Sequence, residues 1–221
     1  MSSIFSKAKF HLSLRPGLYL VLTEPRDGYE RLCEWAVEAG LPCVQLRYKG
    51  QDEREHLALA HKLRRITAGT DTLFIVNDQP DIALISCADG LHLGQNDLPA
   101  AEARRLIGPE LLLGLSTHNL DQVAKANDAP VNYIGFGPIY ATNSKTIPDP
   151  VVGPEAIKDA HAISRHPIVA IGGLNLERIV QLGTYAHNVA VIRAVCDAPE
   201  PLIAMQQMHT GYVALLNGRM K

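Results

Sequence analysis

Short runs of β-branched or leucine-rich residues alternate with amphipathic stretches, starting at Gly17 and continuing almost to the C-terminus. The apolar runs are typical of buried strands, and the amphipathic stretches have the three-to-four-residue spacing of helices. The predicted strands are residues 17–23, 43–49, 72–78, 90–94, 111–117, 133–139, 167–173 and 188–195. A helix is predicted after each strand, at residues 28–39, 52–67, 80–86, 99–107, 119–127, 153–164, 175–182 and 199–217.

This alternation predicts an α/β protein with a parallel sheet, because parallel strands need crossover connections that are usually helices. The eight strand–helix units match a single (β/α)8 TIM barrel over residues 17–221. An open doubly wound sheet has the same alternation, but no Gly-x-Gly-x-x-Gly follows the first strand. Residues 1–16 form an N-terminal extension, which is either frayed or packed across one end of the fold.

The charges do not indicate a nucleic-acid or membrane partner. The chain has 221 residues and a net charge of −2, with acidic and basic residues interspersed, whereas such partners require a basic surface. No apolar run approaches the roughly 18 residues of a membrane span, and the N-terminus lacks the apolar core of a signal peptide. The sequence therefore predicts small-molecule partners, and it leaves the oligomeric state open.

The four cysteines indicate a reducing compartment. They are widely spaced, without a Cys-x-x-Cys pair, and three of them lie in apolar surroundings. This pattern predicts free, mostly buried thiols rather than disulfides or a metal site. We therefore expect a cytoplasmic protein.

The stretch Val44-Gln45-Leu46-Arg47-Tyr48-Lys49 alternates apolar and polar residues. Because successive side chains of a strand point to opposite faces, Gln45, Arg47 and Lys49 are expected on one face. Taken alone, this pattern fits either a sheet edge with one wet face or the wall of a binding cavity.

Polar residues also follow five further predicted strands, where a barrel enzyme carries its active site. Six consecutive units therefore contribute to one rim, which favours the cavity. These residues are Asn77 and Asp78, then Gln95, Asn96 and Asp97, then Ser116, Thr117 and His118, then Thr142, Asn143, Ser144 and Lys145, and finally Gly172 and Gly173.

Asp78 and Asp97 come from neighbouring units and could share one hard cation. Two carboxylates, completed by substrate phosphate oxygens and water, suit Mg²⁺. The alternative is that they are N-caps of the helices that begin near Pro80 and Pro99. The cationic side chains of the same rim favour a metal beside a polyphosphate, which both would neutralise.

Gly172 and Gly173 lie between a strand and a helix, where backbone N–H groups can bind an anion. A Gly-Gly pair is also a common tight turn, but barrels often bind phosphate after strands seven and eight. Two phosphate sites would imply two phosphorylated substrates.

The histidines carry less information about the site. His118 is either an acid–base group or a structural residue. His92 is expected to be a core residue that points into either the barrel or the helix layer, whereas His56, His61, His161 and His187 are expected at the surface.

The ordered motifs VQLRYK, FIVNDQPDIAL, ADGLHLGQNDLP, GLSTHN, YIGFGPIYATNSK, PIVAIGGL and VAVIRAV resemble the thiamine-phosphate synthase family over nearly the whole chain. The resemblance implies a transferase of thiamine biosynthesis with a (β/α)8 barrel. Such an enzyme joins a hydroxymethylpyrimidine diphosphate to a thiazole phosphate and releases pyrophosphate. The implied mechanism is dissociative, with a pyrimidine methylene cation that the thiazole nitrogen captures.

The resemblance also implies a role for each site residue. Arg47, Lys49, Ser116 and Lys145 would be catalytic. The pyrimidine diphosphate would be bound by these four residues together with Gln45 and Asn77. Asp78 and Asp97 would hold Mg²⁺. The thiazole phosphate would be bound by Thr142, Asn143, Ser144, Gly172, Gly173, Ile192 and Arg193.

Some positions depart from the usual family pattern. Ser144 stands where a threonine is common, and it keeps the hydroxyl. Arg193 replaces a small residue, so it could add charge to the phosphate site or turn outward. The alternatives are the related thiazole tautomerase, which shares the Ser-x-His of residues 116–118, a catalytically silent regulatory paralogue, and an isomerase or lyase of the tryptophan-biosynthesis type. The intact Asp78 and Asp97 pair favours the synthase.

Overall fold

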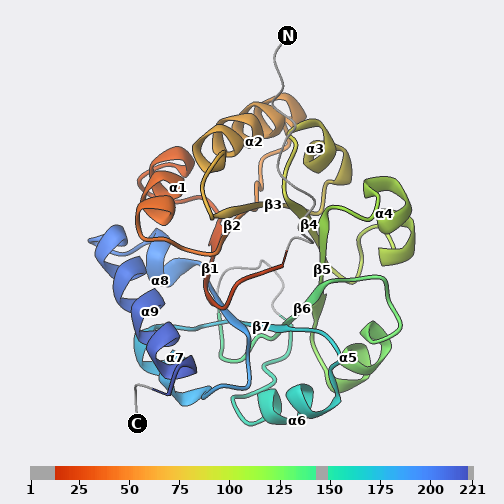
Figure 1. Cartoon of the computed structure of the whole chain (residues 1–221), viewed down its shortest axis with the longest axis vertical. Coiled ribbons are helices and arrows are strands. Elements are labelled where there is room, and N and C mark those ends of the chain that lie inside the picture. The colour runs from red at the N-terminus through yellow and green to blue at the C-terminus, as the bar shows by residue number, and fades with distance from the viewer. Residues whose placement is uncertain (1–12, 143–148, 219–221) are drawn as a thin grey trace.

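Eight parallel strands form a closed barrel, as the alternating pattern predicted (Figure 1). The computed structural model describes residues 13–142 and 149–218. Each strand pairs with the next in the sequence, and β8 closes the ring on β1. The strands are β1 Gly17–Leu22, β2 Cys43–Leu46, β3 Leu73–Asn77, β4 Gly90–Leu93, β5 Leu112–Thr117, β6 Tyr133–Phe136, β7 Ile168–Ile171 and β8 Asn188–Val191.

Helices surround the barrel and cover the outer faces of its strands (Figure 1). The predicted helices are found with small shifts at their ends. They are α1 Tyr29–Glu38, α2 Glu53–Thr67, α3 Pro80–Ile85, α4 Ala100–Ile107, α5 Leu120–Ala126, α6 Ala156–Ile163, α7 Leu176–Gln181 and α9 Pro201–Leu216, with the additional short α8 Arg193–Cys196.

The period-two alternation of the strands separates two apolar layers. Leu18, Leu20 and Leu22 of β1 are fully buried in the cluster between barrel and helices. Tyr19 and Val21 belong to a second cluster, which fills the inside of the barrel. Side chains of one strand therefore build the core with one face and the interior with the other.

Every predicted strand extends beyond the observed one, and the difference matters most for β2 and β8. β2 ends at Leu46, and its register with β1 continues only as far as the Arg47 N–H, which donates to the Leu22 carbonyl at 3.0 Å. Lys49 therefore lies beyond the strand. β8 ends at Val191, and residues predicted to extend it begin the short helix α8.

Residues 13–16 run across the N-terminal end of the barrel (Figure 1). Leu14 is 7% exposed and belongs to the interior cluster. The Leu14 carbonyl accepts a hydrogen bond from His187 Nε2 at 2.9 Å, and the Arg15 carbonyl accepts one from Asn188 Nδ2 at 2.6 Å. This segment therefore closes the bottom of the barrel with an apolar side chain.

Three smaller expectations can also be compared with the structure. All four cysteines are free, and three of them are buried, as predicted. The prediction of a surface position for His56 is wrong, because this residue is 7% exposed and its ring stacks on Tyr48 with the centroids 5.0 Å apart. In the described part of the chain, no helix combines the length and apolar character needed to cross a membrane.

Candidate active site

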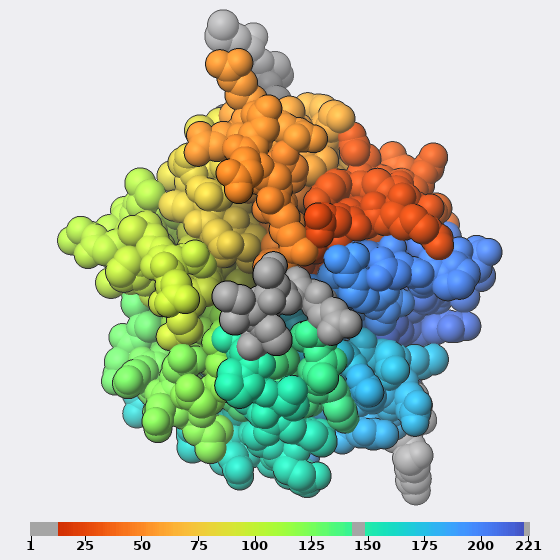
Figure 2. Space-filling view, turned by 180° about the vertical axis from the view of Figure 1, so that it is seen from behind, coloured from red at the N-terminus to blue at the C-terminus, as the bar shows by residue number. Residues whose placement is uncertain are grey.

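Two hollows of the structure lie at opposite ends of the barrel. One, of about 850 Å³, is lined at the N-terminal end by residues such as Arg15, His187 and His209. The other, of about 530 Å³, is lined by residues at the C-terminal ends of the strands. Figure 2 shows this second face, where residues after β2 (orange), β6 (teal) and β8 (blue) surround the centre. Because catalytic groups of such barrels lie at the C-terminal end, this smaller hollow is the candidate active site.

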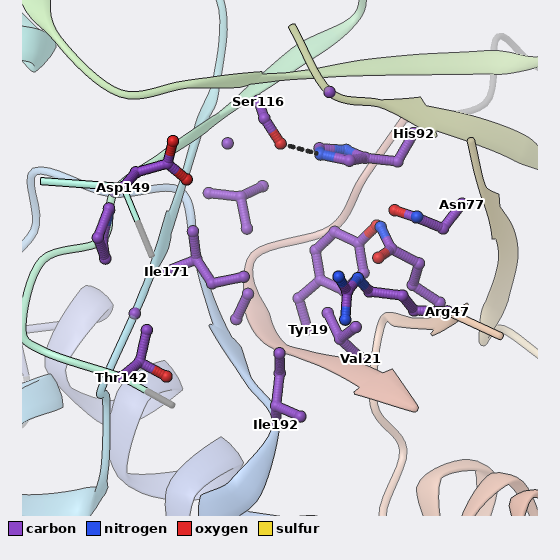
Figure 3. A pocket seen from close by; sticks show the side chains of 18 of the residues that line it. Tyr19, Val21, Arg47, Asn77, His92, Ser116, Thr142, Asp149, Ile171 and Ile192 are labelled. Carbon is purple, nitrogen blue, oxygen red and sulfur yellow. Dashed lines mark hydrogen bonds between the residues drawn. The ribbon is translucent and has the colours of Figure 1, made fainter. Parts of the chain in front are cut away.

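Most of the residues expected at the site do line this cavity. They are Gln45, Arg47, Asn77, Asp78, Asp97, Ser116, Thr142, Gly172, Gly173, Ile192 and Arg193. Lys49 is not part of the lining, and Asn143, Ser144 and Lys145 lie outside the described residues. Figure 3 shows Arg47 and Asn77 on one side of the cavity and Thr142 on the other.

A line of hydrogen bonds crosses the bottom of the cavity. Gln45, only 4% exposed, donates from Nε2 to the Tyr19 hydroxyl at 2.8 Å. The Tyr19 and Tyr133 hydroxyls are 3.0 Å apart, and Tyr133 Oη lies 3.1 Å from His92 Nδ1. His92 Nε2 then lies 2.9 Å from Ser116 Oγ (Figure 3). Gln45 and Ser116, both predicted from the sequence, are therefore joined through three residues.

Burial keeps the two tyrosines of this line protonated. Loss of solvation is the main cause that raises the pKa of both Tyr19 and Tyr133 well above the ordinary value. Both hydroxyls therefore retain their protons at neutral pH and can donate. Neither tyrosine was expected at the site, because no expected site residue lies on their strands β1 and β6. Both have the inward parity of their strands. That parity could have identified them once the strands were placed.

Asp78 and Asp97 both face the cavity rather than capping helices. The N-cap residues of α3 and α4 are Gln79 and Pro99, and neither makes a side-chain cap. Asp97 Oδ2 accepts the Gly94 N–H at 2.6 Å, which holds the turn after β4. Asp78 has a left-handed backbone with φ of 63°, a conformation uncommon outside glycine that functional sites often contain.

These two carboxylates fit a hard cation that keeps most of its other ligands. Within residues 13–142 and 149–218, no group of three or more His, Cys, Asp or Glu side chains could hold a metal ion. Mg²⁺ does not require such a group, since it is often bound by one or two carboxylates with water and substrate phosphate. The donor set therefore suits Mg²⁺ better than a transition metal.

The cationic side chains of the rim differ in position. Arg47 lines the cavity. Lys49 Nζ instead lies 2.8 Å from Glu24 Oε2, and this hydrogen bond is the main reason that the pKa of the Glu24 carboxyl is lowered. Arg193 also lines the cavity, with its guanidinium 3.2 Å from Asp197 Oδ1 and 3.8 Å from Glu24 Oε2. Glu24 thus holds two cations near the mouth.

Gly172 and Gly173 have both a structural and a binding interpretation. A Cβ atom at Gly172 would lie 2.5 Å from Pro138 Cα, and one at Gly173 would lie 2.6 Å from the Ala141 carbonyl oxygen. The Gly172 carbonyl accepts the Tyr140 N–H at 3.0 Å. The two glycine N–H groups donate to no acceptor among the described residues, and both residues line the cavity. They can therefore offer donors to an anion there.

His118 connects the cavity wall to the loop after β6. Its Nδ1 lies 2.6 Å from the Gly137 carbonyl oxygen, so this nitrogen carries a proton and donates. Its Nε2 lies 3.7 Å from Asp149 Oδ2. The imidazole is 17% exposed. These contacts favour the structural interpretation of His118, and sequence reasoning missed its partner Asp149.

Comparison with known proteins points to one family. The profile of the family described as thiamine monophosphate synthase matches residues 18–195. The thiamine-phosphate synthase of Vibrio campbellii is 41% identical over 194 residues, which are 86% of this chain and 95% of the relative. The solved thiamine phosphate pyrophosphorylase of Pyrococcus furiosus is 28% identical, with a TM-score of 0.82 over 94% of this chain and 98% of that chain. A 3-hexulose-6-phosphate synthase, 13% identical with a TM-score of 0.67 over 88% and 99% of the chains, shares the fold alone.

Proposed function

This chain belongs to the thiamine monophosphate synthase family, and on that premise we propose how its cavity forms thiamine monophosphate. It is a transferase of thiamine biosynthesis. Its substrates are 4-amino-2-methyl-5-hydroxymethylpyrimidine diphosphate and a thiazole phosphate, and its second product is pyrophosphate. The free cysteines and the small-molecule cavity are in keeping with work in the cytoplasm.

The β2 to β5 side of the cavity binds the pyrimidine diphosphate in this proposal. Gln45 is deepest and offers amide groups to the neutral pyrimidine ring. Arg47, Asn77 and Ser116 lie closer to the mouth and hold the diphosphate oxygens. Lys49 joins them by exchanging Glu24 for a phosphate oxygen. The resemblance to the family assigns the same role to Lys145, which lies outside the described residues.

The carboxylates of Asp78 and Asp97 would hold Mg²⁺ in this proposal. The support is their common position on the cavity wall, while Gln79 and Pro99 are the N-cap residues of α3 and α4. When bound, Mg²⁺ would neutralise part of the negative charge that develops on the leaving pyrophosphate.

The opposite side of the cavity binds the thiazole phosphate. Gly172 and Gly173 offer backbone N–H groups to its phosphate, and the backbone at Ile192 and Arg193 completes this nest at the start of α8. The guanidinium of Arg193 adds a positive charge. The thiazole ring lies against Thr142. The resemblance to the family assigns Asn143 and Ser144, which lie outside the described residues, to the same substrate.

The chain's side chains favour bond cleavage without a covalent enzyme intermediate. Arg47 and Ser116 stabilise the pyrophosphate as it departs, because fixed donors lower the energy of charge that develops in the transition state. The exposed face of the pyrimidine methylene cation then meets the thiazole nitrogen across the cavity. Holding both reactants in one hollow replaces a collision in solution by an oriented encounter.

One observation carries this proposal: a single cavity brings the Gln45, Arg47, Asp78, Asp97 and Ser116 groups to one side and the Gly172–Gly173 turn to the other. The test is incubation of the purified protein with both substrates and Mg²⁺, with detection of thiamine monophosphate and pyrophosphate. Separate reactions with carboxylated and decarboxylated thiazole phosphate identify the preferred form. Absence of both products from both reactions would refute the proposal and favour a silent ligand-binding paralogue.

A thiazole tautomerase is the closest alternative. The relatives described above carry the synthase or pyrophosphorylase name, and His118, the histidine of the shared Ser-x-His, already donates to the Gly137 carbonyl. Both findings favour the synthase. Conversion of one thiazole tautomer to the other, without pyrophosphate release from the diphosphate, would instead support the tautomerase.

A further inference from the structure

The hydrogen-bonded line from Gln45 to Ser116 contains three residues that the proposed reaction does not use. Tyr19, Tyr133 and His92 each lie within hydrogen-bond distance of two members of the line. Tyr19 and Tyr133 are 1% exposed. Hydroxyls at such depth cost free energy unless they are paired. The line therefore needs an explanation beyond packing.

A line that starts with donation from Gln45 has one direction in which every member is paired. The amide nitrogen of Gln45 can only donate, so the Tyr19 hydroxyl accepts this bond. We take its one proton to go to Tyr133, whose hydroxyl is 3.0 Å away. The Tyr133 proton then goes to Nδ1 of His92, which must carry a lone pair. The neutral imidazole therefore has its proton on Nε2, and this nitrogen donates to Ser116 Oγ.

We propose that Tyr19, Tyr133 and His92 are positioning residues that set the Ser116 hydroxyl as a donor toward the cavity. Because Ser116 Oγ accepts from His92, the serine proton is left for an acceptor in the cavity. A diphosphate oxygen is such an acceptor, so this inference rests on the proposed function. The barrel interior thus orients a group that contacts the leaving pyrophosphate.

Two inward-facing glycines make room for the centre of the line. A Cβ atom at Gly114 of β5 would lie 2.2 Å from Tyr133 Cζ and 2.5 Å from His92 Nδ1. A Cβ atom at Gly135 of β6 would lie 3.4 Å from His92 Cε1. Larger side chains at these positions would separate the tyrosine from the imidazole. The sequence therefore leaves space where the hydrogen bond between them forms.

The proton position on His92 tests the proposal without any substrate. Nitrogen-15 spectra of the histidine-labelled, ligand-free protein at neutral pH show which ring nitrogen carries the proton, and His92→Gln identifies the His92 signals by their loss. We expect the proton on Nε2 alone. A proton on Nδ1 would mean that the line runs in the opposite direction, and an imidazolium would mean that Tyr133 does not donate; either result overturns the proposal.

Kinetics test the effect on the reaction. Tyr133→Phe removes one hydroxyl and keeps the ring, and we expect about tenfold lower kcat with KM changed less than about twofold. The matched control is Tyr212→Phe, which also removes a buried hydroxyl, one that donates to the Ala186 carbonyl at 2.6 Å outside the line. Equal losses of kcat in both variants would assign the effect to stability and overturn the proposal.

A double-mutant cycle separates positioning from structure. His92→Gln and Ser116→Ala should each lower kcat, but the double variant should be little slower than Ser116→Ala, because His92 acts through Ser116. A loss equal to the product of the two single losses would contradict this. If the wild-type protein forms no thiamine monophosphate, the proposed function fails, and the His92 spectra still decide the direction of the line.

Discussion

Asp97 uses one carboxylate for two purposes. Its Oδ2 accepts the Gly94 N–H and so fixes the turn after β4, and the group also lines the cavity. An asparagine in its place keeps an oxygen for Gly94 and loses the negative charge. The structural and the metal-binding roles of this residue can therefore be tested separately.

We predict that Asp97→Asn weakens the apparent Mg²⁺ affinity of turnover by at least about tenfold and leaves the unfolding transition nearly unchanged. Pyrophosphate release measured over a Mg²⁺ titration checks the first expectation, and urea unfolding checks the second. Asp81→Asn is the matched control, because Asp81 is an exposed carboxylate in the first turn of α3. If turnover by Asp97→Asn depended on Mg²⁺ as in the wild type, Asp97 would not be a ligand of the metal.

His209 links stability to pH at the other end of the barrel. Burial is the main cause that lowers the pKa of this histidine, and the positive charge of Arg15 adds to the effect. Its Nδ1 accepts the Leu18 N–H at 3.3 Å, which a protonated ring could not do. The unfolded chain therefore binds the proton more readily than the folded chain.

From this shift we predict a loss of stability in acid. The contribution of His209 is fully present above its ordinary pKa of about 6.5 and decreases as the pH falls through the lower folded value. His209→Asn keeps an oxygen acceptor for Leu18 without a titrating ring. Urea midpoints between about pH 8 and pH 5 should fall less steeply for this variant than for wild type. If the urea midpoints of both proteins fell equally with pH, His209 would not contribute to the loss of stability in acid.

At the scale of elements, the ends of β6 and β7 approach each other at the cavity. Gly172, with φ of 108°, passes so close to Pro138 that a Cβ atom would lie 2.5 Å from the proline Cα. Gly108, which ends α4 with φ of 73°, has a left-handed backbone but open space around it. A comparison of substitutions at Gly108 and Gly172 therefore distinguishes the cost of backbone strain from the cost of a steric clash at the cavity.

Gly108→Ala should cost about 1–3 kcal/mol from the backbone alone, because φ of 73° with ψ of −177° is a conformation that essentially only glycine adopts. Gly172→Ala should cost a further 1–3 kcal/mol or so from overpacking, and it should raise the KM for thiazole phosphate because the strand ends must separate. Urea unfolding and steady-state kinetics measure the two effects. Equal behaviour of the two variants would mean that the chain at Gly172 moves aside without consequence.

In the molecule as a whole, the two ends of the closed barrel have different roles, one in binding and catalysis and the other in stability. The C-terminal end holds the cavity with the candidate site residues, and at the N-terminal end Leu14 of the segment at residues 13–16 packs into the barrel interior. Leu14 is the side chain of this segment that enters the interior cluster. Stability and chemistry are thus separated along the barrel axis, as is typical of this fold.

Leu14→Ala should therefore lower the free energy of unfolding by about 2–4 kcal/mol and leave both KM values and kcat within about twofold of wild type. Urea unfolding and the synthase assay provide the measurements. The matched control is Leu106→Ala, since Leu106 on α4 is 52% exposed and should cost little. A loss of activity in the folded Leu14→Ala protein would show that the two ends are coupled.

The sequence by itself determined the barrel, because a strand-and-helix alternation repeated eight times specifies which faces must be buried. It also placed most of the site, since inward parity and the strand ends pointed to Gln45, Arg47, Asp97 and Ser116. These positions depend on local periodicity, which a single sequence displays.

Only the tertiary structure decided which polar groups meet. β2 leaves the ladder after Leu46, so the alternation that carried Gln45 and Arg47 into the cavity does not carry Lys49, which pairs with Glu24 instead. Tyr19 and Tyr133 are 114 residues apart and meet through closure of the barrel. Such contacts join positions remote in the sequence, and no local pattern encodes the distance between them.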